Sequence, residues 1–439
     1  MAKPRIMIDG YNLALEKGTG IATYARNLAE EVKDLGHPVD LLYGVRTGGK
    51  SELLSEVGFF DPSGYKMTPA SVIRQLTTSP LGTRAREIKL TGKVIARHLQ
   101  GSLPEHDRIV NRANLFSFSR WHLRTFGQFL DVDYENRAQI AHWTYPMPVK
   151  MPKAANLYTI HDLVPLRLPY ATLDNKREFM KVARRIAQKA DHIVTVSDVS
   201  KVDIVNLLDV DESRVTNTYQ AVRLPRKILD RDEDAVRDEV EMFFGLQAKK
   251  YFLFFGAIEP KKNIGRLIEA YLASQSPYPL IIVGQLVWKD NRELRLLDAL
   301  VPEGDTGRLA PPRSTGRKKG GSIMRVDYLP FSLLTSMIRC ARAVVFPSLY
   351  EGFGLPILEA MQLGTAVITG TEGANPEVAG DAALLVDPYD VQSIASGIRT
   401  LTYDDDMLAH YEQAGRARAE LFSPERYAER LQALYAKFS

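Results

Sequence analysis

A stretch near the C-terminal end of the chain, residues 343–370, most constrains the fold. It begins with the apolar run AVVF, which is typical of a buried parallel strand. A loop with two glycines follows, and Pro356 then occupies the place where a helix begins its first turn. A second apolar run, residues 365–369, comes after that helix. The pattern predicts a βαβ unit whose helix N-terminus offers free N–H groups to an anion such as a diphosphate.

Two glutamates lie in this unit, Glu351 in the glycine loop and Glu359 within the helix. A carboxylate beside a phosphate site can accept hydrogen bonds from sugar hydroxyls. Either glutamate alone is more simply explained as a solvated residue of a loop or of an amphipathic helix. Their combination with the flanking FGLP and EAMQLG segments favours a nucleotide-binding role.

The segment PSLYEGFGLPILEAMQLGTAVITG resembles the donor-site signature of the retaining GT-B glycosyltransferases of family 4 (group 1), with its two glutamates. The resemblance implies an α/β fold of two facing Rossmann-like domains, with a C-terminal helix that crosses back to the first domain. It also implies that Glu359 holds the ribose of a nucleotide. Glu351 and the amides of Gly354, Leu355 and Pro356 would then face the donor sugar and the diphosphate.

Length and composition agree with a two-domain protein. A chain of 439 residues exceeds the size that one core usually serves, and 45% hydrophobic with 25% charged residues is ordinary for a soluble globular protein. No apolar run approaches the roughly 20 residues that span a bilayer, and the N-terminus lacks the apolar core of a signal peptide. We therefore expect a cytoplasmic protein. The single cysteine, Cys340, excludes an internal disulfide, and no zinc pattern is present.

The alternation of predicted strands and helices places a first, acceptor-binding domain over residues 1–225 and a second, nucleotide-sugar-binding domain over residues 226–423. A last helix, residues 424–439, is expected to pack on the first domain. The alternation is lost between about 46 and 138, which we interpret as an insertion with helices of its own. Residues 285–324 are glycine-rich and basic, and predict a surface loop that either stays disordered or folds over a phosphate-bearing ligand.

Basic residues outnumber acidic ones between residues 84 and 124 and alternate with apolar residues. Basic amphipathic helices of this kind can lie on an anionic membrane or receive a lipid-linked phosphate. A solvated helical face over a local core explains the pattern equally well. Nucleic-acid binding is disfavoured, because the net charge is only +4 and no recognisable module is present.

Two features of the first domain resemble the same family. Gly20 follows Gly18 and Thr19 at the start of a predicted helix, where the family's glycine pair reads Thr19-Gly20. His161 ends a buried strand within IHDLVPL, which resembles the family's loop whose histidine contacts the transferred sugar. A lone histidine is more often structural, but the resemblance favours function. Asp162 either orients the imidazole or caps the following turn.

Two lysines, Lys261 and Lys262, lie between a predicted strand and a helix that begins after Asn263. A cation there can neutralise charge that develops on a departing diphosphate. Surface lysines alone would carry no meaning, but Lys262 resembles in its place the lysine of the family's arginine–lysine pair. Ala257 occupies the arginine position, and whether Lys261 replaces that arginine stays open.

These features predict a metal-independent, retaining glycosyltransferase that moves a hexose from a nucleotide diphosphate sugar to a saccharide or lipid-linked saccharide. The EPKKN and IHDLVPL segments resemble bacterial mannosyltransferases of O-antigen or capsular polysaccharide, so GDP-mannose is the first donor. A UDP-hexose or dTDP-rhamnose is an alternative donor. The rival functions are a nucleotide-sugar epimerase on the same fold and a catalytically silent protein that binds a membrane or a polyanion.

No cofactor and no metal are expected, because lysine and helix dipoles can neutralise the diphosphate. The predicted catalytic residues are His161, Lys262 and Glu351. The predicted donor-binding residues are Gly20, Lys261, Asn263, Gly352, Phe353, Gly354, Leu355, Pro356 and Glu359.

Overall fold

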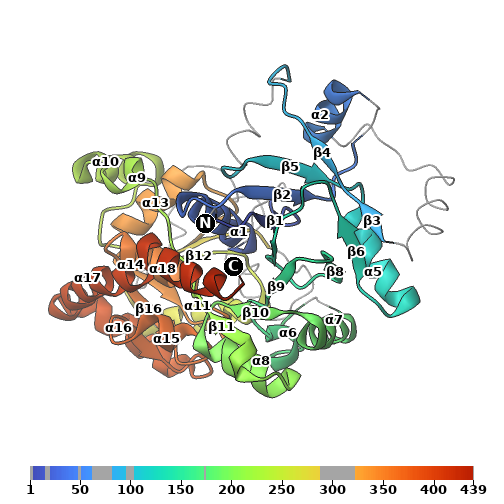
Figure 1. Ribbon diagram of the computed structural model, residues 1–439. Coiled ribbons are helices and arrows are strands. Elements are labelled where there is room, and N and C mark those ends of the chain that lie inside the picture. Colours follow the sequence, from blue (N-terminus) through green and yellow to red (C-terminus); the bar gives the residue numbers. More distant parts are fainter. Residues whose placement is uncertain are drawn as a thin grey trace.

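The computed structural model shows two α/β lobes, each built on a mostly parallel sheet that helices flank (Figure 1). The first lobe holds strands β1 to β11 and the second holds strands β12 to β17. The structure describes residues 3–14, 20–47, 51–61, 82–94, 103–172, 175–286 and 322–438.

Within the described residues, the first lobe contains an eight-stranded sheet in the order β11-β10-β9-β7-β1-β2-β5-β4. Neighbouring strands are parallel except β4 and β5. The inner strands are short apolar runs buried along their length, as a sheet covered on both faces requires. The strands are β1 (Ile6–Asp9), β2 (Val39–Tyr43), β4 (Arg86–Ile88), β5 (Arg108–Asn111), β7 (Ile140–Trp143), β9 (Ala155–Thr159), β10 (His192–Thr195) and β11 (Val215–Asn217).

Shorter elements complete the first lobe. A small sheet in the order β3-β6-β8 lies beside the main one. Ser197 caps α8 by accepting a hydrogen bond from the backbone N–H of Ser200. The elements are β3 (Thr83–Arg84), β6 (Leu130–Asp133), β8 (Val149–Lys150), α1 (Gly20–Asp34), α2 (Glu52–Phe60), α5 (Leu115–Phe126), α6 (Val164–Arg167), α7 (Lys176–Lys189) and α8 (Asp198–Leu208).

The expectation for residues 46–138 is partly wrong, because strand alternation continues within them. β5 pairs in parallel with β2 and so belongs to the main sheet. Its sequence, RIVN, has two aliphatic residues between polar ones, which is too short an apolar run to be recognised.

The basic segment, residues 84–124, differs from the expected series of amphipathic helices. Its described part forms the edge strand β4, the strand β5 between β4 and β2, and most of one helix, α5. Some of its cations are paired within the protein: Arg108 Nη2 lies 2.6 Å from Asp40 Oδ2, and Arg124 pairs with Glu178. A charge count along the sequence therefore overstates the basic surface of this segment.

The second lobe contains a six-stranded parallel sheet among the described residues, in the order β14-β13-β12-β15-β16-β17. The predicted βαβ unit is β15, α14 and β16. The strands are β12 (Phe252–Phe255), β13 (Leu280–Val283), β14 (Ile323–Val326), β15 (Ala343–Phe346), β16 (Ala366–Gly370) and β17 (Leu384–Val386). The helices are α9 (Arg226–Leu229), α10 (Glu233–Phe244), α11 (Ile264–Ser274), α13 (Phe331–Cys340), α14 (Leu355–Gln362), α15 (Asn375–Ala379), α16 (Val391–Tyr403) and α17 (Asp405–Ala419).

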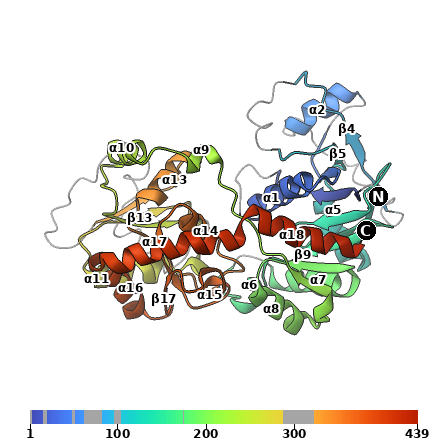
Figure 2. The same cartoon turned by 60° about the vertical axis from the view of Figure 1, so that its left-hand side comes forward.

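The last helix, α18 (Pro424–Tyr435), crosses from the second lobe to the first, as predicted. Figure 2 shows α17 and α18 in red, reaching from one lobe to the other. Ser423 caps α18 and Pro424 occupies its first turn. The helix packs against α1, and Tyr435 near its end bonds to His142 of β7.

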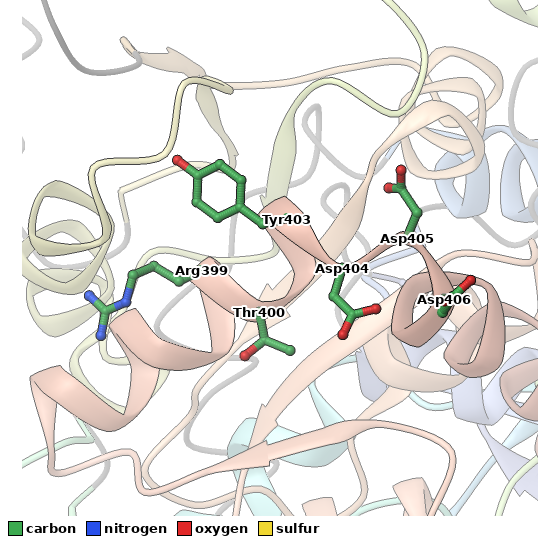
Figure 3. A pocket seen from close by; sticks show the side chains of 6 residues that line it. All are labelled: Arg399, Thr400, Tyr403, Asp404, Asp405 and Asp406. Carbon is green, nitrogen blue, oxygen red and sulfur yellow. The ribbon is translucent and has the colours of Figure 1, made fainter.

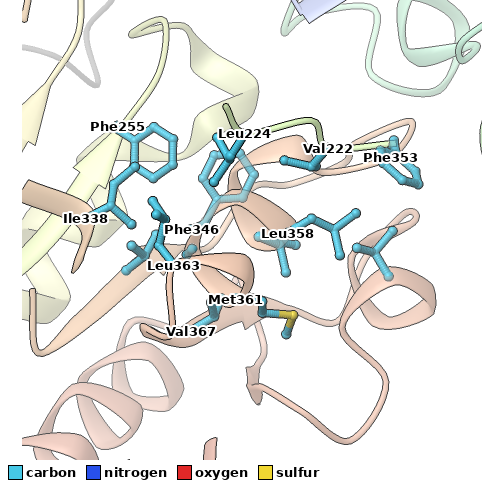
Figure 4. Close-up of a cluster of buried hydrophobic side chains, with 14 of the residues drawn as sticks. Val222, Leu224, Phe255, Ile338, Phe346, Phe353, Leu358, Met361, Leu363 and Val367 are labelled. Carbon is cyan, nitrogen blue, oxygen red and sulfur yellow. The ribbon is translucent and has the colours of Figure 1, made fainter. Parts of the chain in front are cut away.

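The segment that joins the lobes is packed into the second lobe's core. Val222 and Leu224 lie beside Phe346, Leu358 and Met361 in Figure 4. One continuous apolar cluster includes residues of both lobes, so the lobes are packed against each other and not only tethered. The predicted domain boundary near residue 225 lies in this connection, between β11 and α9.

No helix in the part of the chain that the structure describes is long and apolar enough to cross a membrane.

Candidate active site

The predicted site lies where the strand order of the second sheet reverses direction along the chain. β12 has β13 on one side and β15 on the other, so the loops that follow β12 and β15 diverge from a switch point. Such points at the carboxyl ends of parallel strands are the usual ligand sites of open α/β sheets. The backbone N–H of Leu349 donates to the carbonyl of Lys261 at 2.8 Å, which joins the two loops directly.

This junction brings Glu351 and the two lysines together. Lys262 Nζ lies 2.7 Å from Glu351 Oε1 and 4.6 Å from the centre of the Phe346 ring. Lys261 Nζ lies 3.9 Å from Glu351 Oε2 and 3.5 Å from Glu259 Oε1. The carboxylates balance the lysines, so an anionic ligand at Lys262 must take over contacts that Glu351 now makes.

Electrostatic interactions keep Glu351 and Lys261 ionised. Burial by itself raises the pKa of Glu351, but the charges of Lys262 and Lys261 outweigh burial and hold that pKa below its usual value. Burial tends to lower the pKa of Lys261, and Glu351 and Glu259 raise it above its usual value. The site therefore offers a lysine, Lys261, and a carboxylate, Glu351, that stay charged at neutral pH.

Gly352 brings the loop after β15 against the first lobe. A Cβ added there would lie 2.7 Å from Asp162 Cβ and 2.8 Å from the carbonyl oxygen of His161. Only a residue without a Cβ fits this close approach. Gly354 has φ of 100°, in the left-handed region, and immediately precedes α14. The two glycines thus place the N-terminus of α14 next to the His161 turn.

His161 is held in one tautomer. Its Nε2 lies 2.9 Å from the carbonyl oxygen of Thr144, and a carbonyl can only accept, so Nε2 carries the proton. Burial lowers the pKa of His161, which keeps the ring neutral and leaves Nδ1 with a lone pair. Asp162 Oδ1 accepts from the backbone N–H of Val164 at 3.0 Å. Of the two roles left open for Asp162, the structure shows the cap.

Gly20 is the first residue of α1, and it lies next to the second lobe. A Cβ added to Gly20 would lie 3.7 Å from Leu355 Cδ1, the first residue of α14. Two helix N-termini therefore meet here, each with free N–H groups and a positive dipole end. Gly18 and Thr19 lie outside the described residues.

Glu359 lies on the second turn of α14, with Pro356 in the first turn. Burial raises the pKa of Glu359 to about 7. Among the described residues, its carboxylate has no hydrogen bond or ion pair. The structure therefore does not join Glu359 to the lysine cluster, and its predicted contact with a ribose stays a prediction.

Two predicted donor-binding residues make other contacts. Asn263 is fully buried, and its Nδ2 donates to the carbonyls of Pro347 at 3.0 Å and Pro388 at 2.6 Å. Phe353 packs with Phe422 at the junction of the lobes, with ring centroids 5.7 Å apart. In this structure both residues brace the loops around the site.

Sequence reasoning missed Glu377 of α15. Its Oε1 accepts from the backbone N–H of Asp198 at 2.7 Å, and its Oε2 accepts from that of Val199 at 3.0 Å. These N–H groups belong to the N-terminus of α8, which favours a negative charge. The carboxylate therefore links the second lobe to the first. No local signal could reveal it, because the partners are 179 positions apart.

Sequence reasoning also missed Asn375, which is fully buried beside the glycine loop. Its Oδ1 lies 3.3 Å from the place that a Gly354 Cβ would occupy. Neither amide atom has a hydrogen-bond partner within the described residues. An unpaired buried amide is rare because it is costly, which makes this residue a second candidate for ligand contact.

A pocket of about 720 Å³ opens beside the site, between the lobes. Its lining includes Arg167 and Asp203 of the first lobe with Tyr350, Glu372 and Tyr389 of the second. A different hollow lies at the junction of α16 and α17, and Figure 3 shows its side chains spread apart. There Asp404 caps α17 by accepting a hydrogen bond from the backbone N–H of Met407, so this second hollow surrounds the N-terminal end of α17.

Within the described residues, no group of three or more histidine, cysteine, aspartate or glutamate side chains is arranged to hold a metal ion.

Comparisons with known proteins agree with this geometry. Residues 317–418 match the family model described as glycosyl transferases group 1. The O-antigen chain mannosyltransferase B of Escherichia coli is 32% identical over 290 residues, which cover 64% of this chain and 69% of the relative. The serotype-specific mannosyltransferase WbdA of Escherichia coli is 27% identical over 269 residues, covering 60% of this chain and 31% of that longer relative.

Structural similarity extends over the whole chain. The sucrose-phosphate synthase of Thermosynechococcus elongatus superposes with a TM-score of 0.65, covering 99% of both chains at 19% identity. At this low sequence identity the structural similarity shows the fold alone. It confirms the predicted GT-B arrangement of two facing lobes. From the identity to the first relative and its coverage, we conclude that the chain belongs to the glycosyl transferases group 1 family.

Proposed function

We propose that this protein transfers a mannosyl residue from GDP-mannose to a hydroxyl of a saccharide or lipid-linked saccharide, with retention of the anomeric configuration. The names of the relatives, O-antigen chain and serotype-specific mannosyltransferases, support the mannosyl group and the polysaccharide acceptor. The observation that carries the proposal is the Lys262–Glu351 pair at the switch point, with His161 of the other lobe beside it.

The donor diphosphate binds at the two lysines and the N-termini of α1 and α14. On binding, a phosphate oxygen replaces Glu351 at Lys262 Nζ, since the hydrogen bond of that nitrogen is now made to the carboxylate. When the glycosidic bond breaks, negative charge grows on the diphosphate, and fixed cations and helix dipoles stabilise it. We propose that this arrangement works without a metal, and activity that persists in EDTA tests the point.

The transferred sugar lies between Glu351 and His161. Because Nε2 of His161 donates to Thr144, Nδ1 is free to accept a hydrogen bond from a sugar hydroxyl. Glu351, once released from Lys262, accepts from a second hydroxyl. Glu359 accepts from the ribose hydroxyls of the nucleotide, which would give its carboxylate the partners that it lacks.

We also propose peripheral contact with the membrane that carries a lipid-linked acceptor, through the basic segment and the neighbouring helix α2. Leu53 and Leu54 of α2 are 45% and 48% exposed, and Lys89 and Leu90 of the basic segment are exposed as well. Exposed apolar and basic side chains together suit an anionic membrane surface. Sedimentation with anionic vesicles tests this, and a Leu53→Ser/Leu54→Ser protein that sediments like the wild type would contradict it.

Thermal unfolding with GDP, UDP, dTDP and ADP tests the donor. A nucleotide at about 100 times its dissociation constant adds roughly 2.7 kcal/mol of stability. We expect stabilisation by GDP, and transfer from GDP-mannose to follow. A rise in melting temperature with UDP or dTDP alone would contradict GDP-mannose and leave the fold and chemistry intact.

The rival functions are separated by products and by variants. An epimerase would convert the donor sugar without an acceptor and would release no free nucleotide. A catalytically silent protein would keep its full biological activity after Lys262→Ala or Glu351→Ala. NMR of the first-formed product gives the anomeric configuration, and inversion would contradict the proposed stereochemistry.

A further inference from the structure

Tyr24 is a buried residue of α1 that meets His161 directly. Its side chain is fully buried, and its ring meets the imidazole edge-on, with centroids 4.7 Å apart and an angle of 87° between the planes. Such edge-to-face contacts are favourable and directional. The imidazole cannot rotate out of its plane unless Tyr24 moves, because interiors are close-packed.

The hydroxyl of Tyr24 begins a chain of hydrogen bonds that ends on α18. It lies 3.0 Å from Thr159 Oγ1, which in turn lies 3.0 Å from His142 Nε2. His142 Nδ1 lies 2.7 Å from the hydroxyl of Tyr435 on α18. All these groups are buried, so each hydrogen bond is made in a low-dielectric surrounding.

The chain is made of neutral groups and is fully connected. Burial lowers the pKa of His142 to about 3, so its ring is neutral and offers one donor and one acceptor nitrogen. Hydroxyls at both ends can adjust as donors or acceptors. Buried groups joined by hydrogen bonds hold one another in fixed places.

We propose that Tyr24 is a positioning residue for His161, and that the crossing helix α18 sets its place through Tyr435, His142 and Thr159. His161 is then fixed on two sides, by the Thr144 carbonyl at Nε2 and by the Tyr24 ring against its plane. The effect on the reaction rests on the proposed function, because His161 must contact the transferred sugar. A displacement of about 1 Å at such a group can cost on the order of 100-fold in rate.

The first test reads the imidazole itself and needs no substrate. The protein has eight histidines, and labelling them with ¹⁵N gives the shifts of His161, assigned with a His161→Gln protein. We expect Tyr24→Leu to move its nitrogen shifts from the fixed Nε2–H tautomer towards an average of the two tautomers. Tyr24→Phe and Tyr435→Phe should move them less. An unchanged His161 spectrum in Tyr24→Leu would overturn the proposal.

Tyr251→Leu is the matched control for Tyr24→Leu, and Tyr251→Phe is the control for Tyr24→Phe. Tyr251 is fully buried in the second lobe, and its hydroxyl donates to the Met337 carbonyl at 2.6 Å. It has the same chemistry as Tyr24 but no contact with His161. An equal change of the His161 shifts in the control would show a general loss of packing and would also overturn the proposal. If Tyr24→Leu does not fold, the His161 nitrogen shifts are compared between Tyr24→Phe and Tyr251→Phe. A change in Tyr24→Phe that does not exceed the change in Tyr251→Phe would overturn the proposal.

The second test measures turnover of GDP-mannose. We expect Tyr24→Leu to lower kcat by about tenfold or more while the Kd for GDP stays within about twofold, because GDP lacks the sugar that His161 contacts. Unchanged kcat would overturn the proposal. If the wild-type protein does not turn over GDP-mannose at all, the proposed function fails, and the nitrogen shifts still decide the role of Tyr24.

Discussion

The two lobes supply the candidate site in different ways. The second lobe contributes Glu351, the glycine loop and α14 from one continuous stretch, joined to the lysines by contacts between two loops of the same lobe. The first lobe contributes Gly20 from the start of α1 and His161 from the turn after β9, and His161 depends on Thr144, Tyr24 and a helix from the far end of the chain. The nucleotide side is thus built locally, whereas the sugar side is assembled through long-range packing.

Removal of Lys262 should have the largest effect and would test the second lobe's share. We expect Lys262→Ala to lower kcat by about 100-fold or more, because a fixed cation no longer meets the leaving diphosphate. The variant also leaves Glu351 buried without its closest partner, so the pKa of Glu351 should rise. Steady-state kinetics with GDP-mannose measure the loss. A Lys261→Ala protein, measured alongside, shows how much the neighbouring lysine contributes, and a Lys262→Ala protein with near wild-type kcat would contradict the proposed role.

Gly352→Ala should separate the two sides of the site. The new Cβ would lie 2.7 Å from Asp162 Cβ, so the loop and the His161 turn must move apart. We expect kcat to fall by about tenfold or more, with GDP binding within about twofold of the wild type, because the diphosphate side stays intact. Steady-state kinetics measure kcat, and a GDP titration measures the Kd for GDP. Loss of GDP binding in parallel would show that the lobes are less independent than we infer.

Glu377→Ala should loosen the contact between the lobes by a smaller amount. The change removes the carboxylate that accepts from Asp198 N and Val199 N at the start of α8. We expect a loss of roughly 1–2 kcal/mol in the free energy of unfolding and a larger radius of gyration in solution scattering. Glu372→Ala is the control, since Glu372 is an exposed glutamate of the segment that precedes α15. Equal behaviour of the two variants would remove Glu377 as a link.

A last prediction concerns the pH dependence of stability through Glu359. Its pKa is raised to about 7 by burial, so the folded chain binds a proton that the unfolded chain releases above its ordinary pKa of 4.5. The contribution of Glu359 to stability is therefore complete below 4.5 and is lost as pH rises towards 7. We expect Glu359→Gln to unfold at higher temperature than the wild type at pH 8, and to bind GDP more weakly. Equal melting temperatures at pH 8 would contradict the burial effect.

The second lobe could largely be predicted from the sequence because its signals are local. The apolar run at residues 343–346, the glycine loop and Pro356 at the first turn of α14 each report their own structure. The strand β5 was missed because two aliphatic residues are too few to show a period.

The contacts that complete the site could not be predicted. The link from Glu377 to α8, and the path from Tyr435 to His142, join residues 179 and 293 positions apart. Their strength depends on burial and on the docking of the lobes, which no single stretch of the chain encodes. Asn263 illustrates the converse case, since its place beside the lysines suggested a ligand contact, and only the structure shows its amide bonded to Pro347 and Pro388.

The return of the chain through α18 limits how the lobes can move. The polypeptide passes between the lobes twice, once before α9 and once before α18. Two attachment points define a line, and a body held at two points can swing about that line but cannot twist freely around a single tether. We therefore expect the lobes to open for donor entry by rotation about that line. Each closure then returns the His161 turn to the same place over the glycine loop.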